Sequence, residues 1–153
     1  MAASDLSALE DWAGALLAKL NATERRKLNQ DIARELRKGQ QQRIAEQRNP
    51  DGSAYAPRKP RKNLRGKQGH LKRRKMFMKL RQAKHLKLQS TADSIAIGFG
   101  GRSAQLARVH QYGLRDRPAR GMADVQYDRR ELLGLSADDL DLIRDRLIEH
   151  LTD

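Results

Sequence analysis

Positive charge is concentrated in one part of this chain, residues 51–90. This stretch carries fourteen Lys and Arg side chains against a single acidic residue, Asp51, which gives it a net charge of +13. Residues 1–50 carry a net charge of +2 and residues 91–153 a net charge of −2, so about a quarter of the chain holds the whole excess. Such a distribution predicts one surface, arm or loop that faces a polyanion or an acidic partner.

The remaining residues have limited means to build a core. Of the 153 residues, 38% are hydrophobic and 4% aromatic, while 33% are charged. We therefore expect a single domain over residues 1–153, with a thin core of Leu, Ile, Val and Ala and with some parts that order only against neighbouring molecules. The absence of cysteine excludes disulfides and thiolate metal sites. Because no signal peptide and no run of roughly 18 apolar residues is present, we expect a soluble protein.

Apolar residues recur at helical spacing through the first 48 positions. The first helix is indicated by Leu6, Leu9, Trp12, Ala13, Leu16, Leu17 and Leu20. Asn21 and Glu24 resemble a capping box that begins a second helix, whose apolar face consists of Leu28, Ile32, Leu36 and Ile44. Gly39 weakens this helix by up to ~1 kcal/mol, and Asn49-Pro50 ends it. The prediction is a helical hairpin, or one long bent helix, over residues 5–48.

Residues 49–70 are predicted to form a basic loop, because they lack apolar periodicity and are rich in proline and glycine. The loop opens with a turn at Pro50-Asp51-Gly52-Ser53, in which we expect Gly52 to adopt a positive φ. From Leu71 to about Leu88 the pattern favours a basic helix, with Met76, Phe77, Leu80 and Ala83 on one side. Its end near Leu86–Leu88 is also compatible with a strand.

The last third of the chain alternates strand and helix signals, which completes an α+β part over residues 71–153. Residues 94–99 are the best strand candidate, ended by Gly100-Gly101. Ser103 is expected to cap a short central helix containing Leu106, Ala107, Val109 and His110, and Gly113 to terminate it. Val125 and Tyr127 indicate a second strand. Ser136 begins a C-terminal amphipathic helix that carries Leu140, Ile143, Leu147, Ile148 and Leu151.

No convincing catalytic or metal-binding set is present, so we predict neither an enzyme nor a bound cofactor or metal. The four histidines are scattered without metal-ligand spacing, and His110 reads as a packed or hydrogen-bonding side chain. The acidic residues at 138–141 are explained as helix-start residues. No glycine-rich loop is followed by Lys and Ser or Thr as in a phosphate-binding loop.

The basic segment has two interpretations, which the residues alone leave open. In the first, its Lys and Arg side chains bind nucleic-acid phosphates, and the release of condensed counterions drives the binding. In the second, it is a solvated charged loop, or one that pairs with acidic residues of another subunit. Base stacking is not indicated, because Tyr55 and Phe77 are the only interleaved aromatic residues. The candidate contact residues are Arg58, Lys59, Arg61, Lys62, Arg65, Lys67, Lys72, Arg73, Arg74 and Lys75.

Four blocks, in order, resemble the phage virion morphogenesis, or tail-completion, proteins of contractile-tailed phages. They are residues 43–59 (RIAEQRNPDGSAYAPRK), 76–81 (MFMKLR), 107–113 (ARVHQYG) and 129–136 (RRELLGLS). The set spans nearly the whole chain, although residues 114–127 are less similar. Its motif residues in this sequence are Pro50, Asp51, Gly52, Tyr55, Phe77, His110 and Gly113.

The resemblance implies a structural role without catalytic residues. Such proteins complete or cap the head-proximal end of the tail so that it joins a DNA-filled head, and related terminator proteins are α+β subunits that form rings, often hexamers. The implied partners are copies of the chain itself, the tail tube protein, head-completion or connector proteins, and DNA in the tube lumen. The implied location is the virion tail, after assembly in the bacterial host cytoplasm. The alternative is a stand-alone basic nucleic-acid-binding protein.

Overall fold

The longest helix, α2 (Ala22–Ala45), is the frame on which the other elements pack. The structure, a computed structural model, describes residues 2–58 and 75–152. As predicted, Asn21 caps α2, because its side-chain oxygen accepts a hydrogen bond of 2.9 Å from the Glu24 amide. Leu28, Ile32, Leu36 and Ile44 are buried on one face of the helix, which confirms the predicted apolar stripe.

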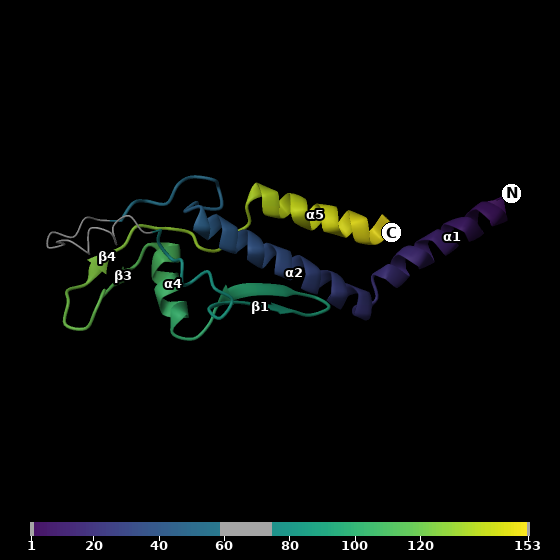
Figure 1. The fold of residues 1–153 in the computed structure, drawn as a ribbon. Helices are drawn as coiled ribbons and strands as arrows, with labels where there is room; N and C mark the ends of the chain where they lie inside the picture. The colour runs from purple at the N-terminus through teal and green to yellow at the C-terminus, as the bar shows by residue number, and fades with distance from the viewer. Residues whose placement is uncertain (1, 59–74, 153) are drawn as a thin grey trace.

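The first helix, α1 (Ala2–Lys19), meets α2 at a bend and projects away from the rest of the molecule (Figure 1). The two predicted helices are present, but they neither pack as a hairpin nor form one long bent helix, because α1 ends at Lys19 and Asn21 caps a new helix. A hairpin would have buried the apolar stripe of α1 against α2, but Leu6, Leu9, Trp12 and Leu17 are exposed by 60%, 56%, 62% and 68%. The end of α1 is fixed by α5, where the Lys19 ammonium donates to the Leu151 carbonyl at 3.4 Å.

A β-hairpin packs against the N-terminal half of α2. Its strands, β1 (Leu86–Ser90) and β2 (Ile95–Phe99), are antiparallel, with Leu86 opposite Phe99 and Ser90 opposite Ile95. Ile95 and Ile97 contact the cluster of Leu28, Ile32 and Leu36. The strand predicted at 94–99 is confirmed, as is the strand alternative near Leu86–Leu88.

The basic helix predicted over residues 71–88 is wrong for its described part. Residues 76–85 form a run of turns, and β1 follows at Leu86. The reason lies at Phe77, whose φ of +67° no right-handed helix accommodates. Residues 71–74 lie outside the described part.

A short helix, α4 (Ser103–Tyr112), follows the hairpin and ends as predicted at Gly113, which has a φ of 63°. The predicted cap at its start is wrong. The N-cap position is Arg102, without a side-chain capping bond, while the Ser103 hydroxyl is 2.6 Å from His85 Nδ1 and so is engaged elsewhere. Two short strands, β3 (Arg115–Asp116) and β4 (Val125–Gln126), pair antiparallel beyond α4.

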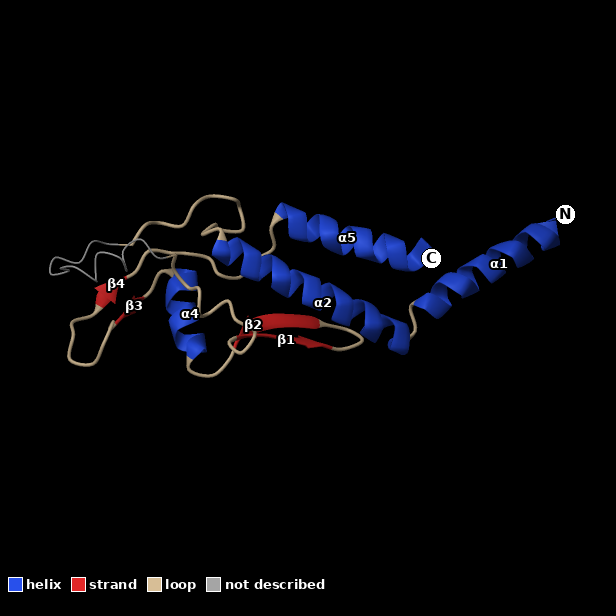
Figure 2. Cartoon of the chain, viewed as in Figure 1, coloured by secondary structure: helices blue, strands red, loops and turns tan. Residues whose placement is uncertain are grey.

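The last helix, α5 (Ala137–Thr152), runs antiparallel along α2 on the side away from the hairpin (Figure 2). Ser136 and Asp139 cap its start reciprocally, because each side chain accepts from the other's amide, at 3.1 and 3.0 Å. The helix packs on α2 through Leu142 and Ile143. Three predicted members of its apolar face remain exposed: Leu140, Leu147 and Ile148.

The described residues thus form two small cores joined by α2. One contains Leu28, Ile32 and Leu36 between the hairpin and α5. The other surrounds Ile44 at the far end of α2 and holds Tyr55, Met76, Leu80, Ala107 and Leu132. Together with the antiparallel strand pairs, this confirms the predicted α+β class and thin core. Among the described helices, none is long and apolar enough to cross a membrane.

Candidate functional site

The turn that leads from α2 toward the basic segment is built as predicted. The Gly52 amide donates to the Asn49 carbonyl at 2.9 Å, and the Asn49 amide donates to the Ser53 carbonyl at 2.8 Å. The Asp51 carboxylate accepts from both the amide and the hydroxyl of Ser53, and the hydroxyl bond is the main reason that the pKa of Asp51 is lowered. Gly52 has a φ of +90°, which confirms its expected positive value.

Pro50 fixes the position of this turn against the chain that enters α5. A Cβ atom added at Gly134 would lie 2.5 Å from Pro50 Cγ, so only glycine allows the two segments to approach this closely. The Asn49 side-chain oxygen also accepts from the Glu131 amide at 2.9 Å. The turn is therefore held by residues 131–134, some eighty positions further along the chain.

Four aromatic rings from distant segments form a continuous edge-to-face series below the turn. The ring centroids of Tyr55 and Phe77 are 5.8 Å apart, those of Phe77 and His110 are 4.8 Å apart, and those of His110 and Tyr127 are 4.8 Å apart. The series brings together three of the predicted motif residues, which come from three of the family-like blocks. The positive φ at Phe77 places its ring between Tyr55 and His110.

Two members of this aromatic series, Tyr55 and His110, have pKa values shifted away from those of exposed side chains. Tyr55 is buried, its hydroxyl donates to the Glu131 carbonyl at 3.0 Å, and burial raises the pKa of the phenol to about 12. His110 is buried as well, and burial together with the charges of Arg130 and Arg58 lowers the pKa of its imidazole to about 4. His110 is thus neutral near pH 7, and its predicted role as a packed side chain is confirmed.

Arg130 fixes the chain directly before residues 58–75, the part of the basic segment that contains the ten candidate contact residues. Its side chain is almost completely buried, and it donates to the carbonyls of Ala56 at 2.7 Å and Pro57 at 3.0 Å. Its own amide donates to the His110 carbonyl at 2.8 Å, which links this anchor to the aromatic series. The backbone directly before Arg58 is therefore held by charge-assisted hydrogen bonds from the core.

Gln47 fixes the chain at Met76, directly after residues 58–75. Its side-chain amide donates to the Met76 carbonyl at 2.8 Å, and its side-chain oxygen accepts from the Met76 amide at 2.8 Å. Gln47 has a φ of 58°, and its carbonyl accepts from the Tyr55 amide at 2.8 Å. One residue at the end of α2 thus binds both the outgoing and the returning chain. We call Arg130 and Gln47 with their backbone partners the segment clamp.

Of the ten predicted contact residues, the structure describes two, Arg58 and Lys75, which directly adjoin the held positions Pro57 and Met76. The others, Lys59, Arg61, Lys62, Arg65, Lys67, Lys72, Arg73 and Arg74, lie outside the described residues. Gly113, the last motif residue, allows close approach of the chain at Arg129, because an added Cβ would lie 2.9 Å from the Arg129 amide nitrogen.

Sequence reasoning missed the polar side chains that organise this region. The buried Arg43 guanidinium donates to the carbonyls of Glu131 and Leu132, both at 2.9 Å, and to the Gln40 side-chain oxygen at 2.6 Å. Gln111 binds the backbone of Leu132 and Leu133 from the other side. One signal was available: Gln40 and Arg43 continue the helical spacing of the buried Leu28, Ile32 and Leu36.

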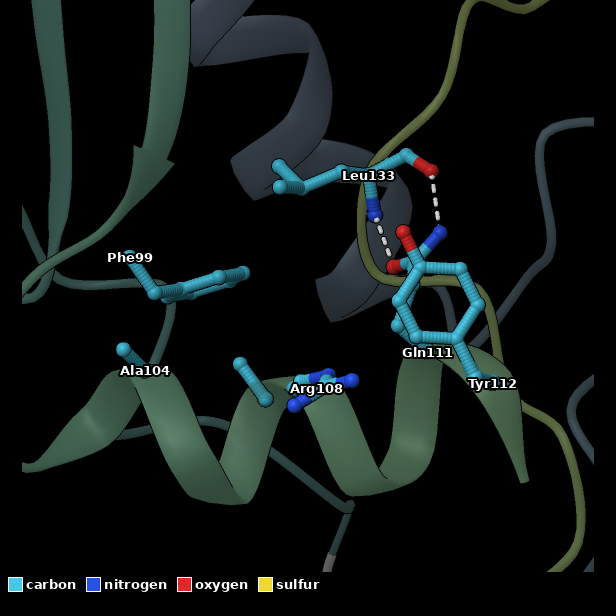
Figure 3. Close-up of a pocket in the computed structure, with 7 residues that line it drawn as sticks. Phe99, Ala104, Arg108, Gln111, Tyr112 and Leu133 are labelled. Atoms are coloured by element: carbon cyan, nitrogen blue, oxygen red, sulfur yellow. Dashed lines mark hydrogen bonds between the residues drawn. The ribbon is translucent and has the colours of Figure 1, made fainter. Parts of the chain in front are cut away.

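An open groove lies between α4, the end of β2 and the chain that enters α5 (Figure 3). It has a volume of about 300 Å³, and its walls are mostly apolar. We call it the α4 groove; its lining consists of Phe99, Ala104, Ala107, Arg108, Gln111, Tyr112 and Leu133. Gln111 holds the far wall in place, since its side chain hydrogen-bonds both the amide and the carbonyl of Leu133. Within residues 2–58 and 75–152, no group of His, Asp and Glu side chains is arranged to hold a metal ion.

Comparison of the sequence with known proteins shows that it belongs to a family of phage assembly proteins. Residues 4–152 match the model of the phage virion morphogenesis family, and the chain belongs to that family. A similar protein is the tail completion protein S of Escherichia phage P2. It is 34% identical over 149 residues, which cover 97% of this chain and 98% of the relative. No solved structure matches the chain.

Proposed function

We propose that this protein is a structural subunit that completes the head-proximal end of a phage tail and enables the tail to join the head. The support is its membership of the family over nearly its whole length, together with the name of the P2 relative, which assigns that protein to tail completion. The proposal needs no catalytic group.

The segment clamp is the structural observation that carries this proposal. Arg130 and Gln47 hold the two ends of the most basic part of the chain against the core, beside the family motif residues Tyr55, Phe77 and His110. The fold thereby fixes the described residues on either side of this part, Arg58 and Lys75. Ten cationic side chains, Arg58 to Lys75, are the proposed contacts to phosphates or to acidic partner surfaces.

In this proposal several copies form a ring, six being the number that the resemblance implies. The ring contacts the tail tube protein on one side and head-completion or connector proteins on the other, and its basic segments face passing DNA. A thin-cored subunit gains stability from such an assembly, because binding stabilises the folded state. The protein would be part of the virion after assembly in the host cytoplasm.

Deletion of the gene from its phage tests this function. We expect lysates that contain DNA-filled heads and separate tails, with joined particles restored when the gene is supplied in trans. Electron microscopy of the particles and counting of infectious units provide the measurement. Joined, infectious particles in the absence of the protein would refute the proposal. The presence of tail-tube and tail-sheath genes beside this gene is a further expectation.

A second candidate function is nucleic-acid binding by the isolated protein, favoured by the net charge of +13 in residues 51–90. Binding of this kind weakens steeply with salt, because it releases condensed counterions. A titration with duplex and single-stranded DNA over a range of salt concentrations measures it. Absence of affinity even at low salt would remove this candidate without affecting tail completion.

A further inference from the structure

The apolar stripe of α1 lacks the packing that normally stabilises an amphipathic helix. Leu6, Leu9, Trp12 and Leu17 are each more than half exposed, and Trp12 is the only tryptophan of the chain. A helix of this kind gains most of its stability from burial of its apolar face. Contiguous exposed apolar surface of this kind marks an interaction site, and tryptophan is the residue type most enriched among interface hot spots.

The α4 groove is a matching apolar surface at the other end of the molecule. α1 leaves the N-terminal end of α2, whereas α4 packs at the C-terminal end, where Ala107 contacts Ile44 (Figure 1). The 24 residues of α2 separate the two by about 36 Å, at 1.5 Å per residue. α1 therefore does not reach the groove of its own chain while α2 is intact.

The charges of the two surfaces are complementary. Residues 6–18 contain Glu10 and Asp11 and neither Lys nor Arg. The α4 groove is lined by Arg108 and by no acidic residue. Glu10 lies one helical turn from Leu6, at the edge of the apolar stripe, and within the described residues neither Glu10 nor Arg108 forms a salt bridge.

The other exposed apolar face, on α5, is less suitable as a partner for α1. Its residues Leu140, Leu147 and Ile148 belong to a helix with five acidic side chains and two arginines. Both helices thus carry net negative charge, and like charges across an interface oppose association.

We infer that α1 of one copy binds the α4 groove of a second copy, with Trp12 as the apolar anchor and Glu10 paired with Arg108. The contact joins unlike surfaces at opposite ends of an elongated subunit. Such head-to-tail contacts build rings when their rotation closes, whereas a contact of two like surfaces stops at a dimer. This inference rests on the ring formation that we propose above and names the surfaces that would produce it.

Disulfide trapping tests the contact directly, because the chain has no cysteine of its own. The variants Leu9→Cys and Ala104→Cys, one of them carrying a size tag, are mixed in equal amounts and oxidised gently. We expect a covalent dimer that contains one chain of each kind, and little product from either variant alone. As a matched control, Leu9→Cys is mixed with Leu140→Cys, for which we expect little product. Preferential trapping of Leu9→Cys with itself or with Leu140→Cys would overturn the inference.

Self-association of the full chain provides a second, independent readout. In analytical ultracentrifugation we expect Trp12→Ala to weaken association by at least about ten-fold, the size of a hot-spot effect, while Leu140→Ala, an equally exposed apolar position, leaves it unchanged. Glu10→Arg and Arg108→Glu are each expected to weaken association, and the double variant to restore it.

The outcomes separate this inference from the proposed function. If Trp12→Ala and the charge variants associate like the wild type, the named surfaces are wrong although the ring remains. If the wild type is monomeric at every concentration, both the surfaces and the ring are wrong. Neither result bears on tail completion, which the gene deletion tests separately.

Discussion

Buried polar side chains determine the path of the chain around the basic segment. In the described part, Gln40, Arg43, His110, Arg130 and Asp139 are buried among the apolar residues. Most of their bonds go to backbone carbonyls and amides that no helix or strand would otherwise satisfy, such as the Leu132 carbonyl that accepts from Arg43. Loss of one such donor leaves its buried partner unpaired, which costs about 1–3 kcal/mol.

Gly52→Val should destabilise the protein. The φ of +90° at Gly52 is disfavoured for a branched residue, and because an added Cβ meets no atom within 4 Å, the cost is one of backbone conformation alone. We expect a loss of roughly 1–3 kcal/mol in the free energy of unfolding, measured by urea denaturation. Gly98→Val is the matched control, since Gly98 lies in β2 without a positive φ and also has free space around Cβ. Equal stability of Gly52→Val and the wild type would contradict this role of the turn.

Protonation of His110 should make the fold sensitive to mild acid. Its pKa is about 4 in the folded protein and about 6.5 in a free side chain, so between these pH values only the unfolded chain binds the proton. The neutral His110 side chain therefore makes its full contribution to the free energy of unfolding above pH 6.5, and this contribution is lost as the pH falls toward 4. We expect the free energy of unfolding to decrease from pH 7 to pH 5 in the wild type and to change less in His110→Gln. An identical pH dependence of the two proteins would refute this assignment.

At the scale of elements, the periodic segments were predictable and the segment between them was not. Apolar spacing and caps indicated the helices at 22–45, 103–112 and 137–152 and the strand at 95–99. Met76, Phe77 and Leu80 have helical spacing too, yet they form turns, because Phe77 takes its conformation from contacts with Tyr55 and His110. Local sequence carries no signal of such contacts.

The candidate site was predictable to a similar extent. The turn at Pro50–Ser53 follows from its residue types, and His110 was correctly read as a packed side chain. Arg43 at least continues the helical spacing of the buried face of α2, but Arg130 and Gln47 had no distinguishing mark in a chain that is 33% charged. Their partners are backbone atoms far away in sequence, such as the Glu131 carbonyl that accepts from Arg43. Only the folded chain shows which of many similar side chains are buried.

Gly39→Ala should lower stability, although alanine is the better helix former. The sequence indicated that Gly39 weakens α2, but an added Cβ would lie 2.8 Å from Asp139 Oδ1. The Asp139 carboxylate cannot simply move away, because it is buried and accepts hydrogen bonds from Gln40 and from the Ser136 amide. Displacement of α5 should outweigh the gain in helix propensity, for a net loss of roughly 1 kcal/mol.

Gly14→Ala in α1 is the control for this substitution, because nothing lies within 4 Å of its added Cβ. Here we expect a small increase in helix content by circular dichroism and no loss of stability. If Gly39→Ala stabilised the protein as much as propensity alone predicts, the close approach of α5 to α2 would be incorrect.

At the scale of the whole molecule, structural and interaction residues are separated. Both cores lie along α2, whereas the predicted contact residues all fall in the sequence between Pro57 and Met76, the two positions that the segment clamp holds. The helices α1 and α4 lie toward opposite ends of α2 (Figure 1); α1 carries exposed apolar side chains and α4 borders the α4 groove. Substitutions in either set are therefore expected to change assembly more than folding.

Reversal of charge at Arg58, Lys59, Arg61 and Lys62 to Glu should impair head–tail joining more than it impairs folding. These residues follow the clamped carbonyls of Ala56 and Pro57, and the change lowers the net charge of the segment by eight units. We expect circular dichroism and thermal melting close to those of the wild type, with strongly reduced production of infectious particles in the trans assay. Parallel loss of melting temperature and joining would mean that the segment is structural.

Because of the segment clamp, we expect the residues that contact partner molecules, between positions 58 and 75, to change in evolution independently of the residues that fold the subunit. Since Arg130 and Gln47 hold the chain at Pro57 and Met76 from within the core, we expect an insertion between these positions to leave both anchors intact; closure of a flexible loop costs about 0.6 kcal/mol more for each doubling of its length. Length and charge between positions 58 and 75 can then drift with the surfaces of a particular head and tail, while the residues that fold the subunit stay unchanged.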